Sequence, residues 1–455
     1  MGIRKAAKWG MLLLQSGAYK TPGLGRDTAP EVQDLGSHME YQRRVVDDEL
    51  TRLLTSAGAI VLEGPKAVGK TETASQRAAS EVRLDVDANA RELARIDPAL
   101  LLKGPAPRLI DEWQIEPSLW NHVRREVDNR RGLTGQFILT GSAVPADDAS
   151  RHTGAGRFSR LRMRPMTFYE SGQSTGDVSL VALFAGEKPR ATDSGLTIPQ
   201  VIDRVCIGGW PALFEKSPEE AQRAMRSYLD EIARTDIQEM DGVRRDPSKV
   251  KRVLRSIARN VATQASDTTI AADVGGSEGP LDRKTVARFH DALNRLMIIE
   301  DLPAWTPELR SRIRLRTAAT RHFVDPSLAV AALNASPTKL LKDLNFFGLL
   351  FESLVVRDLR VYLQNSGGRL LHYRDSENLE VDVILEMEDE RWAAIEVKLG
   401  TSQIDDGAKT LLNFSQKIDI TRSGKPTFLA VVTATGFGYR RDDGVYVLPI
   451  GTLKP

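Results

Sequence analysis

The fold of this chain is decided by one stretch of sequence, Gly64-Pro65-Lys66-Ala67-Val68-Gly69-Lys70-Thr71. Its spacing, G-x-x-x-x-G-K-[ST], is that of a phosphate-binding loop, and it lies between an apolar run at 59–62 and a helix-forming segment at 72–79. The two glycines permit a tight turn in which successive N–H groups and the start of the helix face a pyrophosphate. Lys70 adds a cation for the β and γ phosphates, and the Thr71 hydroxyl is a ligand for Mg²⁺. We therefore predict that these eight residues bind a nucleotide together with Mg²⁺.

The composition is that of a globular protein. The chain has 455 residues, of which 41% are hydrophobic and 27% charged, so we expect about two to four domains. A net charge of +2 gives no overall argument for nucleic-acid binding. The single cysteine, Cys206, excludes an intramolecular disulfide and a cysteine zinc cluster, and no apolar run approaches the roughly 20 residues of a membrane helix. These features predict a cytoplasmic protein without a membrane partner.

The pattern of apolar runs predicts the order of the elements. Residues 1–38 have no periodic apolar face, which predicts a disordered leader. From residue 57 onward, helical segments separate short apolar runs. These runs lie at 59–62, 83–86, 109–110 and 137–139. Strands joined by helical crossovers form a parallel sheet covered on both faces, and a nucleotide binds at its carboxyl edge.

Two further strands end in polar side chains that a nucleotide site would use. The strand at 108–110 leads into Asp111 and Glu112. Asp111 can hold Mg²⁺ through water, and Glu112 can orient or deprotonate the attacking water. The strand at 137–139 ends near Thr140 and Ser142, either of which could contact the γ phosphate or the water, although a capped turn explains them equally simply. The order of loop, acidic strand and polar strand strengthens the nucleotide hypothesis.

Residues 57–165 resemble an AAA-type ATPase core. In this resemblance the loop is the Walker A motif, 109–112 is the Walker B motif and 140–142 is the sensor segment. The motif at 164–168, Arg-Pro-Met-Thr-Phe, and the motif at 208–211, Gly-Gly-Trp-Pro, resemble those of prokaryotic AAA proteins with a C-terminal domain of unknown function 4143. The resemblance extends over nearly the whole chain from about residue 40. It implies that the nucleotide is ATP and that the chain is an ATPase.

The same resemblance points to an arginine that contacts the γ phosphate. It favours Arg157 over Arg160 and implies action across a subunit boundary, hence a homo-oligomer. Because the segment 151–164 is simply rich in arginine, a structural role for either residue is an open alternative.

The sequence pattern of the region after the core predicts mainly helices. We predict an AAA-type core at 39–170, a helical lid at 171–242 and a connecting segment at 304–344. The order helix, short helix, helix, strand within 243–303 is that of a winged helix, in which Lys284, Arg288 and Arg295 could meet the phosphates of DNA. The alternative is that this region only packs against the lid or a protein partner.

The C-terminal residues 345–455 form the second candidate for chemistry. Their element order is similar to the restriction-endonuclease-like core, and Glu352, Asp382, Glu396 and Lys398 resemble its PD-(D/E)xK set. Glu396 and Lys398 share one face of a strand, Asp382 and Glu396 could bind Mg²⁺, and Lys398 could activate water. The alternative is a former nuclease whose charges form a buried ion network or serve only in binding.

The sequence thus predicts an α/β protein in which a parallel AAA-type sheet with a helical lid is followed by a winged helix and an endonuclease-like domain. The function that we favour is Mg²⁺-dependent ATP hydrolysis. The alternatives are an ATP-regulated, metal-dependent DNA nuclease and a nucleotide-switched protein that binds a partner.

Overall fold

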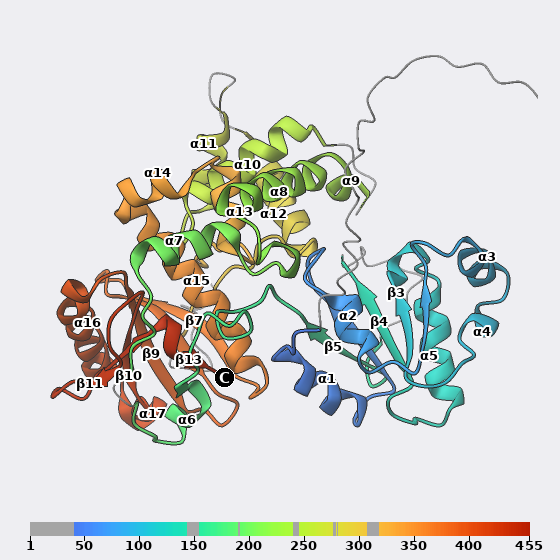
Figure 1. Ribbon diagram of the computed structural model, residues 1–455, viewed down its shortest axis with the longest axis horizontal. Coiled ribbons are helices and arrows are strands. Elements are labelled where there is room, and N and C mark those ends of the chain that lie inside the picture. The colour runs from blue at the N-terminus through green and yellow to red at the C-terminus, as the bar shows by residue number, and fades with distance from the viewer. Residues whose placement is uncertain are drawn as a thin grey trace, which may run out of the picture. The chain divides into compact units, whose positions relative to one another are not determined.

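The first sheet is built around the strand that precedes the phosphate-binding loop (Figure 1). In the computed structural model, which describes residues 41–142, 154–189, 192–239, 245–275, 279, 281–306 and 318–455, this sheet has five parallel strands in the order β2-β3-β4-β1-β5. The predicted leader lies outside the described residues. The predicted parallel α/β sheet is confirmed. The strands are β1 (Ala59–Glu63), β2 (Ser80–Arg83), β3 (Arg108–Asp111), β4 (Phe137–Gly141) and β5 (Phe158–Arg162).

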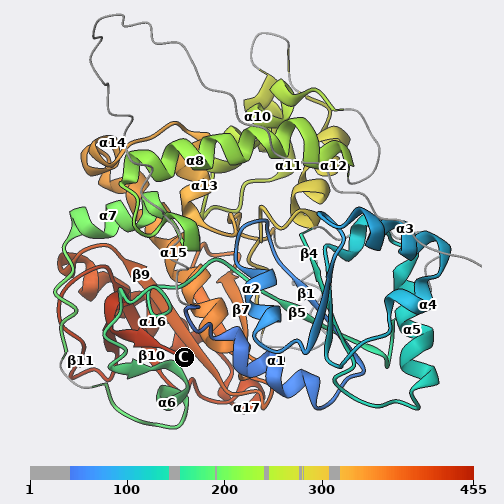
Figure 2. The same cartoon turned by 45° about the vertical axis from the view of Figure 1, so that its right-hand side comes forward.

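The sheet is buried on both faces, as alternate residues of β1 demonstrate. Ile60 and Leu62 pack into one hydrophobic core, whereas Ala59 and Val61 pack into another. Figure 2 shows α1 and α2 on one side of the sheet and α3, α4 and α5 on the other. The helices are α1 (Val46–Leu54), α2 (Lys70–Ser75), α3 (Ala88–Ile96), α4 (Pro98–Leu101) and α5 (Leu119–Asn129), and the short 3₁₀ turn η1 (Trp113–Ile115) follows β3.

The second strand of this sheet differs from its predicted position. We expected it at 83–86, but β2 ends at Arg83. Asp87 caps α3 by accepting a hydrogen bond from the Ala90 N–H at 3.0 Å, and Val86 is exposed. The chain therefore leaves the sheet early because the cap of the next helix requires a turn there.

A helical region follows the first sheet. It contains α7 (Ile198–Ile207), the 3₁₀ turn η2 (Pro211–Leu213), α8 (Pro218–Glu231), the π-helical turn η3 (Ile232–Asp236), α9 (Ile237–Glu239), α10 (Pro247–Arg259), α11 (Asp267–Gly275), α12 (Arg283–Arg295), α13 (Pro326–Ala332) and α14 (Pro337–Lys342). After α12, two antiparallel bridges join Ile299 to Phe323 and Leu302 to Thr320. The predicted winged-helix order is compatible with these elements and stays a prediction.

A long helix and a mixed sheet form the C-terminal part. The helix α15 (Leu344–Gln364) begins at Asp343, whose side chain accepts a hydrogen bond from the Phe346 N–H. The sheet order is β11-β12-β10-β9-β8-β7, with parallel pairs between β9, β10 and β12 and antiparallel pairs elsewhere. Its elements are β7 (Arg369–Arg374), β8 (Glu380–Glu386), β9 (Trp392–Lys398), β10 (Leu429–Thr433), β11 (Tyr439–Arg440) and β12 (Tyr446–Pro449), with the turns η5 (Thr401–Gln403) and η6 (Ile450–Thr452) and the helices α16 (Ile404–Lys417) and α17 (Ile420–Ser423).

Part of the segment that we assigned to the lid contacts the C-terminal end of the chain instead. The strand β6 (Val178–Ser179) pairs in parallel with β13 (Leu453–Lys454), and α6 (Leu180–Phe184) follows it directly. The Ser174 hydroxyl also donates a hydrogen bond to the Leu453 carbonyl at 2.6 Å. Pairing between segments so distant in sequence has no local signature, which is why the helical pattern alone did not reveal it.

Candidate functional site

The phosphate-binding loop connects β1 to α2 and holds its lysine inward. Gly69 has a φ of 96°, in the left-handed region that glycine adopts without strain, directly before the helix. The Lys70 Nζ is buried and donates hydrogen bonds to the carbonyl oxygens of Gly64 and Pro65, each at 3.0 Å. Burial lowers the pKa of Lys70 to about 8, against the opposing effect of two nearby carboxylates. Within the described part of the chain, the hydrogen-bond partners of the Lys70 ammonium group are therefore neutral carbonyl groups.

Asp111, at the end of β3, links the loop to the neighbouring strand β4. Its carboxylate accepts hydrogen bonds from the Thr71 hydroxyl, at 2.9 and 3.2 Å, and from the Thr140 hydroxyl. All three side chains supply oxygen atoms, which Mg²⁺ prefers, and Mg²⁺ at nucleotide sites uses one or two carboxylates plus phosphates. Thr71 and Asp111 therefore fit a Mg²⁺ site completed by a nucleotide.

Glu112 follows Asp111 in a left-handed conformation, with φ 53° and ψ 45°. Its carboxylate accepts hydrogen bonds from the Gln114 side-chain amide and from the Ser142 hydroxyl, the latter at 3.3 Å. The structure thus separates two candidates that the sequence left open, because Thr140 contacts Asp111 whereas Ser142 contacts Glu112. A left-handed non-glycine residue costs backbone energy and is common at functional sites.

Arg157 lies at the opposite edge of the sheet from the loop of its own chain. It immediately precedes β5, whose Phe158 pairs with Ala59 at the start of β1, while the loop follows the end of β1. Its side chain is 43% exposed, and the guanidinium pairs with Asp128 at 2.9 Å. The alternative candidate, Arg160, pairs with Glu63. A catalytic role for Arg157 would thus require a neighbouring copy of the chain and stays a prediction.

Arg44 is a site residue that sequence reasoning missed. Its buried guanidinium donates to the Val68 carbonyl of the loop at 2.9 Å and to the Arg164 carbonyl at 2.8 Å. It also pairs with Glu170 at 3.1 Å. These charge-assisted contacts hold the loop in place at Val68. Because Arg44 and Glu170 lie 126 residues apart, no local motif could have indicated their contact.

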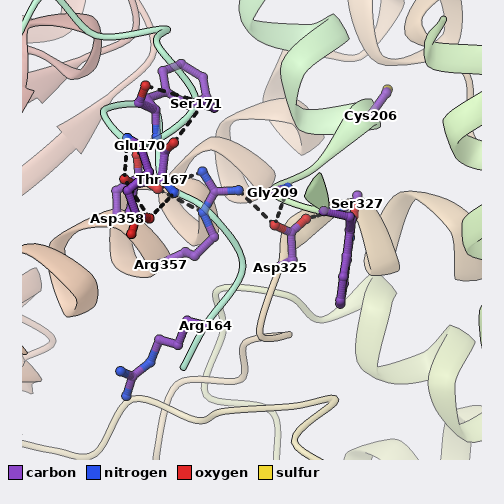
Figure 3. A network of polar contacts seen from close by, with 12 residues as sticks. Arg164, Thr167, Glu170, Ser171, Cys206, Gly209, Asp325, Ser327, Arg357 and Asp358 are labelled. Carbon is purple, nitrogen blue, oxygen red and sulfur yellow. Dashed lines mark hydrogen bonds and ion pairs between the residues drawn. The ribbon is translucent and has the colours of Figure 1, made fainter. Parts of the chain in front are cut away.

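A buried polar network connects the segment after β5 to the helical region and to α15, as Figure 3 shows. The Arg357 guanidinium donates to Asp325 at 2.8 Å and to Asp358 at 2.6 Å. Asp358 accepts a hydrogen bond from the Phe168 N–H at 2.9 Å, and Asp325 accepts one from the Gly209 N–H at 3.0 Å. The two sequence motifs at 164–168 and 208–211 therefore meet at one cluster of buried charges.

The candidate site residues of the C-terminal domain also lie close together, around Lys398. Its Nζ lies 2.6 Å from a Glu396 carboxylate oxygen and 3.8 Å from an Asp382 oxygen, across the neighbouring strands β9 and β8. The other Glu396 oxygen, Oε1, is buried and has no hydrogen-bond partner among the residues that the structure describes. Burial raises the pKa of Glu396 to about 8, and the Asp382 carboxylate adds to this effect.

Glu352, on α15, belongs to the same cluster electrostatically. Burial raises its pKa well above the usual range, and the Asp382 carboxylate raises it further. Within the described residues, however, no group of three or more His, Cys, Asp or Glu side chains is arranged to hold a metal ion. The contacts of Lys398 agree with the ion-network interpretation, and the unpaired Glu396 oxygen leaves the metal hypothesis open to test.

Comparison with family models divides the chain into three matched parts. Residues 56–172 match the AAA domain, residues 198–339 match a domain of unknown function, DUF8612, and residues 347–453 match the domain of unknown function DUF4143. The resemblance stated from the sequence, to AAA proteins with a C-terminal domain of unknown function 4143, is confirmed. Its endonuclease-like part stays a prediction.

Two relatives match the chain, and both are described as uncharacterized proteins. An uncharacterized protein of Mycobacterium tuberculosis and one of Mycobacterium bovis are each 25% identical over 360 residues, which cover 77% of this chain and 73% of the relative. Among solved structures, a Walker-type ATPase of Pyrococcus abyssi is similar at 14% identity and a TM-score of 0.37, covering 63% of this chain and 94% of the other. In the part of the chain that is described, no helix has both the length and the apolar character to cross a membrane.

Proposed function

We propose that this chain, which carries an AAA domain at 56–172 and a DUF4143 domain at 347–453, hydrolyses ATP to ADP and phosphate with Mg²⁺. One observation carries the proposal. Thr71 of the loop and Thr140 of β4 both donate hydrogen bonds to Asp111, and Glu112 is the next residue. The groups for metal, phosphate and water thus converge at the carboxyl edge of one parallel sheet.

Each residue has a defined task in this reaction. Lys70 exchanges its two backbone carbonyl partners for phosphate oxygens, which are stronger acceptors because they are charged. Thr71 and Asp111 would hold the Mg²⁺ ion, which would neutralise negative charge on the phosphate groups when it is bound. Glu112 orients the attacking water and accepts its proton as the bond to the γ phosphorus forms and the bond to the bridging oxygen breaks.

The test of this proposal is Lys70→Ala. We expect kcat/KM for phosphate release to fall by at least about 10²–10³-fold, because a charged donor to the transferred group is lost. Phosphate release and binding of a fluorescent ATP analogue are measured on the same preparations. Unchanged turnover in Lys70→Ala would overturn the assignment. Binding without turnover in the wild type would favour the nucleotide-switched partner-binding alternative.

A second candidate function is Mg²⁺-dependent hydrolysis of DNA by the C-terminal cluster. The observation that favours it is the buried, unpaired Glu396 Oε1, which a cation between Glu396 and Asp382 would satisfy. In support of a nucleic-acid partner, Lys284 and Arg288 of α12 are exposed and form no ion pair among the described residues. Arg295, in contrast, pairs with Asp291 at 4.0 Å.

Incubation with plasmid and with single-stranded DNA tests this candidate. Mg²⁺ or Mn²⁺ is supplied with and without ATP, and Lys398→Ala is compared with the wild type. We expect metal-dependent cleavage in the wild type and its loss in Lys398→Ala. Intact DNA under every condition would leave the cluster as an ion network and the domain as a binding module.

A further inference from the structure

The phosphate-binding loop contains a second lysine whose side chain contacts the helical region instead of the loop. The Lys66 Nζ lies 2.6 Å from the Asp236 Oδ1, across 170 residues of sequence. The Lys66 side chain is 49% exposed, whereas that of Asp236 is 6% exposed. We propose that Asp236 competes with the phosphates of the nucleotide for the Lys66 ammonium group, so that this ion pair opposes nucleotide binding. This inference rests on the proposed ATP site.

The position of Lys66 in the loop supports a phosphate-binding role. It lies between Gly64 and Gly69, on the segment whose backbone N–H groups face a bound polyphosphate. Its long side chain is half exposed, so it can change rotamer without disturbing a packed core. A triphosphate offers several charged oxygens close to this segment, and a lysine ammonium binds such oxygens as a mobile point charge.

The position of Asp236 indicates that the contact is more than a surface ion pair. Asp236 is the last residue of η3, a π-helical turn that continues α8, and turns of this kind occur often at functional sites. Among the described residues, Lys66 is the one hydrogen-bond and ion-pair partner of the Asp236 side chain. A buried carboxylate is costly without a cation, so Asp236 retains Lys66 strongly as long as no phosphate is present.

The helical region also approaches the loop beside this pair. An atom at the Cβ position of Gly69 would lie 3.9 Å from Pro211, which belongs to the Gly-Gly-Trp-Pro motif. The ion pair therefore closes a contact between the loop and elements of the region at 198–339. Transfer of Lys66 to a phosphate would remove this attachment, so nucleotide binding and the contact with the helical region oppose one another.

The decisive variants are Asp236→Asn and Lys66→Met. Affinity is measured by fluorescence anisotropy of a fluorescent ATP in EDTA, so that turnover does not interfere. Asp236→Asn keeps the shape of the side chain but releases Lys66, and we expect Kd to fall about tenfold. We expect Lys66→Met to raise Kd about tenfold. In the double variant the Asp236 substitution has no further effect, because no lysine remains to be released.

The matched control is Asp230→Asn on α8. Asp230 pairs with Lys251 at 2.6 Å, and its side chain is 46% exposed and lies on the same helical segment. We therefore expect Asp230→Asn to bind the fluorescent ATP with the same Kd as the wild type. The inference is overturned if Asp236→Asn binds the fluorescent ATP no more tightly than the wild type does. It is also overturned if Lys66→Met binds it as tightly as the wild type does. If Asp236→Asn does not fold, the Kd of Lys66→Met still tests the inference, because the Lys66 side chain is half-exposed. A wild type that binds no nucleotide contradicts the proposed ATP site itself.

Discussion

The phosphate-binding loop and the C-terminal cluster both place a lysine beside carboxylates, but they hold it differently. Lys70 contacts two neutral carbonyl groups at 3.0 Å, whereas Lys398 contacts the Glu396 carboxylate at 2.6 Å. A cation held by neutral groups gains by moving to a phosphate, because the new acceptors are charged. A cation already paired with a carboxylate gains less. The comparison supports chemistry at the loop more directly than at the C-terminal cluster.

The pKa values of the two lysines diverge for the same reason. Burial lowers the pKa of Lys70 to about 8. Burial also lowers the pKa of Lys398, but the carboxylates of Asp382 and Glu396 outweigh this effect and raise it above the usual value. A bound ligand can therefore change the pKa of Lys70, whereas the positive charge of Lys398 is already balanced by the neighbouring carboxylates.

The largest effect that separates the two regions is expected from Glu112→Gln. The amide cannot accept the proton of the attacking water, so kcat for phosphate release falls by about 10²–10⁴-fold while the Kd for ATP changes little. Phosphate release and fluorescent ATP binding are measured together. Lys398→Ala serves as the control from the other region and keeps kcat within about twofold, since the ion-pair partners of Lys398 in the described residues are Glu396 and Asp382, which lie outside the loop site. Equal losses in both variants would contradict the separation of the two sites.

The pH dependence of nucleotide binding sharpens the comparison at the loop. The pKa of free Lys70 is lowered to about 8, and a bound phosphate raises it, so binding takes up a proton when the pH exceeds that value. ADP affinity, measured by calorimetry in EDTA, is therefore roughly tenfold weaker at pH 9 than at pH 7. Lys70→Arg stays charged over this range and its affinity is flat. A flat profile in the wild type would show that the charge of Lys70 does not limit binding.

Features with a local signature were predictable from the sequence. The loop could be placed because it follows a buried strand, and Asp111 and Thr140 because they lie at the carboxyl ends of the neighbouring strands, since parallel strands end at the same edge of a sheet. The cluster of Glu396 and Lys398 followed from the two-residue period of a strand.

Features that depend on distant pairing were not predictable. Arg44 and Asp236 reach the loop from 24 and 170 residues away, and nothing in the sequence around them indicates either contact. The place of Arg157 at the far edge of the sheet depends on the register of β5 with β1, which the residues of β5 do not specify. The local sequence pattern thus predicted which residues are candidates for the site, and tertiary packing decided which of their side chains contact one another.

Steady-state phosphate release by the wild-type protein tests the central claim most directly. Purified protein is incubated with ATP in Mg²⁺ and, in parallel, in EDTA. We expect one phosphate for each ADP formed in Mg²⁺ and loss of release in EDTA, because Thr71 and Asp111 would hold a metal that the γ-phosphoryl transfer requires. ATP binding with no phosphate release in Mg²⁺ would contradict it.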